Sequence, residues 1–159
     1  MKEERVLIII KPDALVRGLF GEITQRLERK GLKIIGTKMT RLGDVVLDEH
    51  YSHLTDKPFF KDLKGFMQSA PVVLMAISGF NAVKATRIIV GATDAVVADA
   101  GTIRGDLALS TQSNLVHASD SIENGEIEVA RFFEEEDLFD YERPDAKMVY
   151  SDHLMGNRD

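Results

Sequence analysis

The residues around His117 are the ones in this chain best suited to chemistry. His117 follows two apolar residues, Leu115 and Val116, and precedes Ser119 and Asp120, residue types that often cap helices. This pattern predicts a turn between a strand and a helix, where side chains are often exposed in a cleft. A neutral imidazole is a competent nucleophile near pH 7, because its ordinary pKa is about 6.5. Its attack on a phosphoryl group would give a phosphohistidine, from which a second acceptor could collect the group. On spacing alone, a histidine that only hydrogen-bonds a backbone carbonyl is the alternative.

Phosphoryl transfer asks for cations and Mg²⁺ around the transferring group rather than for covalent work by the protein. Lys11 directly follows an apolar run, at the carboxyl end of a predicted strand. Arg87 and Arg104 are the only cations between residues 85 and 130. These three side chains are therefore the natural candidates to hold an anionic ligand, with ordinary ion pairs as the alternative interpretation.

Several other kinds of site are excluded by what the chain lacks. None of its 159 residues is cysteine, which excludes a disulfide framework, a cysteine nucleophile and a thiolate metal site. The patterns of a P-loop, a dinucleotide-binding loop and a serine hydrolase elbow are absent. A net charge of −6 argues against a broad nucleic-acid surface, because binding phosphate backbones needs clustered cations. His50 and His53 have a spacing that could hold a metal, but no third ligand is evident, and the spacing is more typical of a surface feature.

The chain must supply the elements that position these residues. The longest apolar run, residues 6–10, is far too short to cross a bilayer, and no signal peptide is recognisable. We therefore expect a cytoplasmic protein that makes no membrane contact. Its length predicts a single domain, residues 1–159, of which about 141–159 form a C-terminal tail that docks on the rest.

Hydrophobic periodicity divides the chain into short elements. Strands are predicted at residues 6–10, 32–42, 72–77 and from 115, and helices at about 20–30, 46–54, 63–67, 81–91 and 120–133. Asn81 is predicted to cap one helix, and Asp120 with Glu123 to form a capping box for another. Gly31 and Gly91 are predicted to end helices. Residues between 91 and 114 show no sustained period, which is typical of a long functional loop.

This order of elements, β-α-β-α-α-β-α-β-α, predicts an α+β fold. The type it favours is a ferredoxin-like split βαβ sandwich, with a four-stranded antiparallel sheet and helices on one face. A doubly wound parallel sheet is the main alternative, although the extra helices at 44–69 would fit it poorly.

Six short blocks of this sequence resemble those of one known family. The most specific is NLVHASDS at residues 114–121, which is similar to the family's signature around its phosphorylated histidine. Five further blocks match in order and spacing: Lys11–Asp13, Arg17–Leu19, His50–Tyr51, Lys57–Phe60 and Gly101–Asp106. From Arg5 to about Tyr150, the chain resembles the nucleoside diphosphate kinases.

The resemblance implies a ping-pong transfer of the γ-phosphoryl group from a nucleoside triphosphate, typically ATP, to a nucleoside diphosphate. It implies that His117 becomes phosphorylated, that Glu128 hydrogen-bonds its imidazole, and that Ser119 supports this pair. The family's Mg²⁺ is held mainly by the nucleotide phosphates, so the resemblance implies no metal site made by the protein itself.

The resemblance also assigns the residues that bind nucleotide. Those matching phosphate-binding positions are Lys11, Tyr51, Arg87, Thr93 and Arg104. Lys11 and Asn114 match positions that reach the sugar hydroxyls. Phe59 matches the aromatic residue on which the base stacks, a contact that tolerates every base. Simpler interpretations stand beside these: Phe59 or its neighbour Phe60 could belong to the core, and Arg87 could bind the carbonyls at the end of its own helix.

The chain departs from the family pattern in places that concern assembly more than chemistry. Ala118 replaces a common glycine, and residues 94–100 lack the prolines usual in a loop that packs against neighbouring subunits in the family. Residues 111–113 and Met148 also differ. The resemblance implies a homo-oligomer, for which we favour a hexamer over a tetramer. Two alternative functions are a ferredoxin-like nucleic-acid-binding module and a non-catalytic nucleotide-binding assembly protein.

Overall fold

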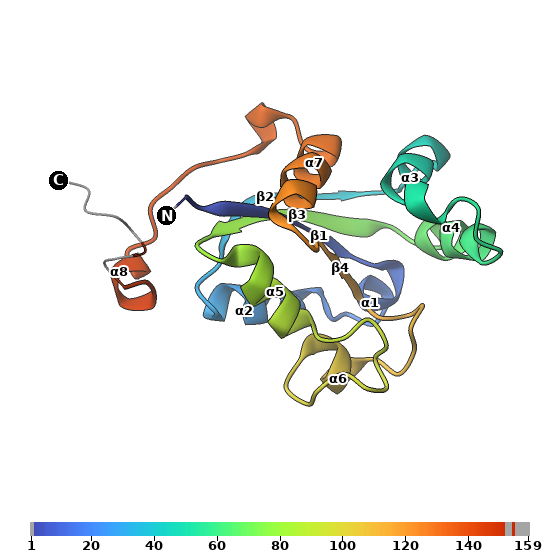
Figure 1. The fold of residues 1–159 in the computed structure, drawn as a ribbon, viewed down its shortest axis with the longest axis horizontal. Coiled ribbons are helices and arrows are strands. Elements are labelled where there is room, and N and C mark those ends of the chain that lie inside the picture. Colours follow the sequence, from blue (N-terminus) through green and yellow to red (C-terminus); the bar gives the residue numbers. More distant parts are fainter. Residues whose placement is uncertain (1, 152–153, 155–159) are drawn as a thin grey trace.

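The sheet at the centre of the molecule has four antiparallel strands in the order β2-β3-β1-β4 (Figure 1). The structure is a computed structural model that describes residues 2–151 and 154. The strands are β1 (Glu4–Ile10), β2 (Lys33–Thr40), β3 (Val72–Gly79) and β4 (Val116–Ala118). All four predicted strands are therefore present. The antiparallel pairing confirms the split βαβ fold and excludes the doubly wound parallel sheet.

Helices connect the strands and cover them. They are α1 (Pro12–Val16), α2 (Phe20–Arg29), α3 (Asp44–His50), α4 (Phe60–Gln68), α5 (Ala82–Val90), α6 (Ile103–Leu107), α7 (Ile122–Phe132) and α8 (Ala146–Val149). Two short 3-10 helices span Ser52–Leu54 and Glu135–Asp137. None of the helices in the described part of the chain is long and apolar enough to cross a membrane. Neither α1 nor α6 was predicted, because each is only five residues long.

The prediction that helices cover only one face of the sheet is wrong. Val6, Ile8 and Ile10 pack into one hydrophobic cluster with residues of α2 and α5. Leu7 and Ile9 face the other way, into a second cluster with residues of α3, α4 and α7. Figure 1 shows α2 and α5 on one side of the sheet and α7 on the other. Successive side chains of a strand point to opposite faces, so an unbroken apolar run such as residues 6–10 requires cover on both.

The ends of the helices agree only in part with the predicted caps. The chain after α2 turns at Gly31, with φ 100°, and Gly91 ends α5, with φ 86°, as predicted. The capping box of Asp120 and Glu123 is wrong: Ser121 caps α7 by accepting a hydrogen bond from the backbone N–H of Asn124 (3.1 Å). Asn81 does precede α5, but its side chain makes no capping hydrogen bond.

The segment that follows residue 138 docks on the rest of the molecule, as predicted for the part of it that the structure describes. The hydroxyl of Tyr141 donates to the backbone carbonyl of Ile34 (2.8 Å), and that of Tyr150 to Gly31 (3.1 Å). The Tyr150 ring also lies edge-on to Phe80, with ring centroids 5.1 Å apart. The rest of the predicted tail, residues 152–153 and 155–159, lies outside the described residues.

Candidate active site

His117 lies in the middle of β4, opposite Ile9 of the central strand. Its neighbours on β4 are buried, whereas the His117 side chain keeps about a fifth of its surface exposed (21 %). The strand therefore fixes the backbone on both sides of a ring that solvent can still reach. The predicted turn from strand to helix is present, but it follows Ala118 and leads to the Ser121 cap of α7, so His117 lies in the strand rather than in the turn itself.

A chain of hydrogen bonds orients the His117 ring. Its Nε2 lies 3.0 Å from Oε2 of Glu128, which projects from α7. The hydroxyl of Ser119 donates to the same carboxylate oxygen (2.6 Å) and accepts from the backbone N–H of Leu7 (3.0 Å). A carboxylate can only accept, so Nε2 carries the proton, and in the neutral ring the lone pair is left on Nδ1. The three residues thus select one tautomer and leave Nδ1 as the nucleophilic atom.

Neighbouring groups stabilise the charged form of the Glu128 carboxyl. Burial alone would raise the pKa of the carboxyl, but the hydrogen bond and charge of His117 and the hydrogen bond of Ser119 lower it below its ordinary value. Glu128 is therefore an anion at neutral pH. An anion held against Nε2 also stabilises the ring when positive charge develops on it during attack by Nδ1.

A second histidine, His50, packs against His117. The two rings meet edge to face with centroids 4.6 Å apart, and His50 meets Tyr51 and Phe132 in the same way. Nδ1 of His50 lies 3.2 Å from Nη1 of Arg131, which can only donate. Burial, with the charges of His117 and Arg131, lowers the pKa of His50 to about 3. The interpretation of His50 and His53 as a surface pair is wrong, since His50 is 5 % exposed and only His53 faces solvent.

A second chain of hydrogen bonds lies just before the start of β4 and joins Lys11, Asn114 and Thr93. The ammonium of Lys11 donates to Oδ1 of Asn114 (2.7 Å), and the amide nitrogen of Asn114 donates to the carbonyl of Thr93 (2.9 Å). Lys11 and Asn114 are both buried, at 8 % and 2 % exposed. Burial, together with the charge of Arg104, lowers the pKa of Lys11 to about 8. A bound anion would therefore stabilise the charged form of Lys11, which burial and Arg104 disfavour.

Arg104 donates its hydrogen bonds to the backbone. Its guanidinium donates to the carbonyls of Asn114 (3.2 Å), Gly91 (3.0 Å) and Val116 (2.6 Å). It thereby ties the end of α5 to the start of β4. Burial, with the nearby charge of Arg87, lowers the pKa of Arg104 to about 10. The geometry gives Arg104 a structural role that its position in the sequence did not reveal.

The remaining predicted nucleotide-binding residues differ in how exposed they are. Phe59 is 51 % exposed, and it is Phe60 that packs against the core. Tyr51 is buried, and burial with the charge of Glu128 raises the pKa of its hydroxyl above the ordinary value. Arg87 projects from the last turn of α5 and is exposed.

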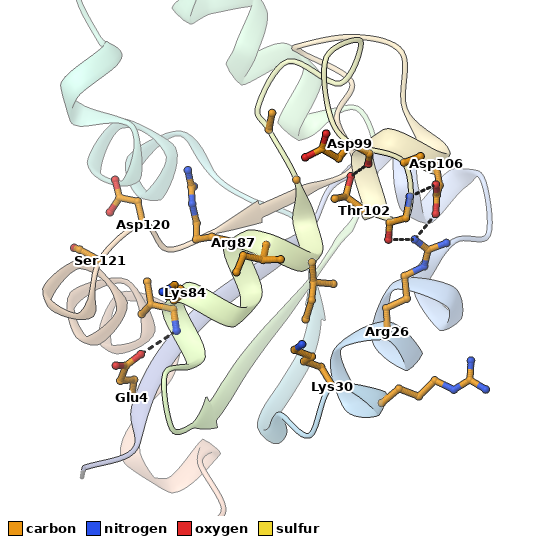
Figure 2. Close-up of a pocket in the computed structure, with 18 of the residues that line it drawn as sticks. Glu4, Arg26, Lys30, Lys84, Arg87, Asp99, Thr102, Asp106, Asp120 and Ser121 are labelled. Carbon is orange, nitrogen blue, oxygen red and sulfur yellow. Dashed lines mark hydrogen bonds and ion pairs between the residues drawn. The ribbon is translucent and has the colours of Figure 1, made fainter. Parts of the chain in front are cut away.

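Arg87 also lines an open groove between α2 and α5. Figure 2 shows Asp120 and Ser121 at one end of this groove, Arg26, Thr102 and Asp106 at the other, and Arg87 between them. Arg26 and Asp106 form an ion pair there, with Nη1 and Oδ2 2.7 Å apart. His117, Lys11 and Asn114 do not line the groove, and Arg87 is related to the site around β4 by the effect of its charge on Arg104.

The family model described as "Nucleoside diphosphate kinase" matches residues 4–138. The chain belongs to the nucleoside diphosphate kinase family. The resemblance noted from the sequence is thereby confirmed, and the nucleic-acid-binding and non-catalytic alternatives are not favoured. Its activity is that of a nucleotide-binding phosphotransferase.

Individual relatives agree with the family model. The chain is 46 % identical over 148 residues to the nucleoside diphosphate kinase of Parabacteroides distasonis, covering 93 % of this chain and 97 % of that protein. It is 45 % identical over 149 residues to that of Methanothermobacter thermautotrophicus, covering 94 % and 99 %. A structure of the Halobacterium salinarum enzyme in complex with CDP superposes with a TM-score of 0.90 at 42 % identity, covering 94 % of this chain and 99 % of the other.

Sequence reasoning missed several residues that shape this kinase site. Leu115 has φ 72°, a left-handed conformation that leucine rarely adopts. Its carbonyl accepts from the N–H of Lys11 (2.9 Å), and its N–H donates to Oδ2 of Asp13 (3.1 Å). Asp13 belongs to a matched family block, which was the only sequence signal for it. Nothing in the sequence pointed to Arg131 as the partner of His50.

Proposed function

We propose that this nucleoside diphosphate kinase transfers the γ-phosphoryl group through a phosphohistidine at Nδ1 of His117. In the first half-reaction the Nδ1 lone pair attacks the γ-phosphorus, a P–N bond forms, and the bond to the β–γ bridging oxygen breaks as the nucleoside diphosphate leaves. In the second, a β-phosphate oxygen of another nucleoside diphosphate attacks the same phosphorus and the P–N bond breaks. The observation that carries the proposal is the Ser119–Glu128–His117 chain, which leaves the lone pair on Nδ1.

The cations around β4 are proposed to hold the nucleotide phosphates. Lys11, Arg87 and Arg104 supply the positive charge, with Tyr51 and Thr93 as further phosphate contacts. The lowered pKa values of Lys11 and Arg104 support this assignment, because a bound anion would compensate both the burial of these cations and the repulsion from a neighbouring guanidinium group. Lys11 and Asn114 would reach the sugar hydroxyls, and the exposed ring of Phe59 would stack on the base.

Mg²⁺ is proposed to enter with the nucleotide. The side chains assigned to the phosphates are cationic, phenolic or hydroxyl groups and provide no carboxylate cage. That set suits a cation held by phosphate oxygens, as Mg²⁺ commonly is in kinases. Its contribution when bound would be to neutralise charge on the phosphates during transfer.

The test is incubation of the protein with γ-labelled ATP and Mg²⁺. We expect one label per chain that is labile to acid and stable to base, as a phosphohistidine is and a phosphoserine is not. Added nucleoside diphosphate should remove the label as labelled triphosphate. The His117→Ala variant should take up none.

The matched control is His53→Ala, which changes an exposed histidine outside the site and should label like the unaltered protein. Label that persists in His117→Ala would overturn the proposal and move the chemistry to another residue, with Ser119 and Ser121 as the first to examine. A base-labile product would lead to the same conclusion.

We also propose that the chain works as a homo-oligomer in the cytoplasm, a hexamer rather than a tetramer. Support for assembly comes from apolar side chains in the two loops on either side of α6: Val96 and Val97 are 68 % and 70 % exposed, and Leu109 is 86 % exposed. Apolar surface of this kind commonly marks a protein interface. Light scattering on the purified protein measures the assembly mass directly, and a monomer or tetramer would overturn the hexamer.

A further inference from the structure

The environment of His117 contains one group that the transfer reaction does not use, the buried imidazole of His50. One ring nitrogen of His50, one of His117 and a carboxylate oxygen of Glu128 all lie within 4.8 Å of one another. Two imidazoles and one carboxylate are a ligand set of catalytic zinc sites. We propose that these three residues, the His50–His117–Glu128 cluster, bind a divalent cation of the zinc type and that its binding switches the nucleophile off. The switching, but not the binding, rests on the proposed role of His117.

The spacing of the cluster suits a cation with short bonds to nitrogen. If three atoms lie within 4.8 Å of one another, a point exists that is no more than about 2.8 Å from each of them. Zinc bonds to histidine nitrogen and carboxylate oxygen at about 2.0–2.2 Å. Small side-chain rotations of less than about 1 Å would therefore close the site. Nε2 of His117 and Oε2 of Glu128, 3.0 Å apart, are already at the separation of neighbouring ligands on one cation.

His50 brings a nitrogen that the protein leaves unused. Its Nε2 is buried and has no hydrogen-bond partner among the described residues, and the side chain is 5 % exposed. A buried polar atom without a partner is uncommon and calls for a physical explanation. Once its proton has moved to Nδ1, coordination of a cation would give Nε2 a partner.

Arg131 opposes this coordination and so sets its strength. Arg131 donates to Nδ1 of His50 and therefore keeps the ring proton on Nε2, the unpartnered nitrogen that we assign to the cation. For the cation to bind, that proton must move to Nδ1 and the Arg131 guanidinium must withdraw. Nε of Arg131 is paired with Glu49 (2.8 Å), which restrains the withdrawal. Weakening the Arg131 contact should thus tighten metal binding.

Binding would remove the nucleophile in either of two ways. A cation on Nε2 of His117 replaces the proton shared with Glu128, and the neutral ring then carries its proton on Nδ1. A cation on Nδ1 occupies the lone pair directly. In both cases no lone pair is left to attack the γ-phosphorus.

The experiment measures Zn²⁺ binding to the intact protein by calorimetry without nucleotide, with Co²⁺ absorption as a second readout of coordination. One ion per chain is expected. His50→Gln should weaken the affinity at least tenfold, and Arg131→Gln, whose amide oxygen can accept from Nδ1–H, should strengthen it at least threefold. His53→Gln is the matched control and should stay within twofold of the unaltered protein.

Absence of stoichiometric binding would overturn the proposal, as would an unchanged affinity in His50→Gln or an equal loss in His53→Gln. If His50→Gln folds poorly, the Arg131→Gln result decides: an unchanged or weaker affinity overturns it. The switching is then tested by measuring the rate of phosphohistidine formation with Mg²⁺ in excess and with free Zn²⁺ held at a fixed concentration by a metal buffer. We expect Zn²⁺ to slow this rate at least tenfold. Because binding is measured without nucleotide, its failure and a failure of the phosphohistidine proposal are separate results.

Discussion

The Lys11→Met substitution removes a charge from one of the most enclosed positions in the site and keeps most of the side chain's volume. Lys11 is 8 % exposed, and its pKa falls from 10.5 to about 8 because of burial and the charge of Arg104. At about 1.4 kcal/mol per pH unit, keeping this ammonium charged costs the folded protein roughly 3 kcal/mol at neutral pH. The substitution also leaves Oδ1 of Asn114 without its donor, which costs about 1–3 kcal/mol. The variant should therefore be more stable than the unaltered protein at pH 7, by up to about 2 kcal/mol.

The sign of the pH dependence follows from the same pKa values. Between pH 8 and 10.5 the unfolded chain holds a proton at Lys11 that the folded chain has released, so the stability of the unaltered protein rises with pH in this window. The variant lacks this titration. Its advantage at pH 7 should shrink steadily above pH 8 and disappear by about pH 10, where the lost Asn114 hydrogen bond offsets what remains.

The assay is urea denaturation at pH 7 and pH 10, at one protein concentration because assembly would couple to folding. Lys61→Met is the matched control: Lys61 is an exposed lysine on α4, and its loss should change the free energy of unfolding by less than about 0.5 kcal/mol at either pH. A Lys11→Met protein that is clearly less stable at pH 7, or a difference that does not change with pH, would refute the reasoning. Nucleoside diphosphate affinity should fall in the same variant, which separates stability from function.

Two further substitutions, Gly125→Ala and Ser119→Ala, test how α7 is held against β1. A Cβ on Gly125 would collide with the backbone carbonyl of Arg5, so Gly125→Ala should destabilise by about 3 kcal/mol; Gly65→Ala, a helix glycine with open space around it, should instead stabilise by about 0.5–1 kcal/mol in the same urea titration. Ser119→Ala leaves the buried N–H of Leu7 without an acceptor and removes a donor from Glu128. It should cost about 2–4 kcal/mol and slow phosphohistidine formation, and normal labelling at reduced stability would show that Ser119 serves the fold alone.

The sequence was sufficient to predict those features that depend on a local pattern of residues. Residues 6–10 could be read as a central strand because five consecutive apolar side chains suit full burial, and they are fully buried. The glycines at 31 and 91 marked helix ends because glycine has no Cβ and adopts the positive φ found there without strain. The motif at 114–121 and the blocks that accompany it identified the family, since the order of short blocks along a chain is a property of sequence alone.

Only the tertiary structure decided what each polar side chain meets. Lys11 binds Asn114, 103 positions along the chain, and no local pattern reports a contact of that range. Arg104 was expected to hold an anion or an ordinary ion pair, yet the folding of α5 and β4 around it gives its guanidinium three carbonyls. His50 looked like half of a surface pair, and the packing of α3 against α7 buried it beside His117. Side-chain partners are set by how elements distant in sequence pack together, whereas periodicity reports only which face of an element is apolar.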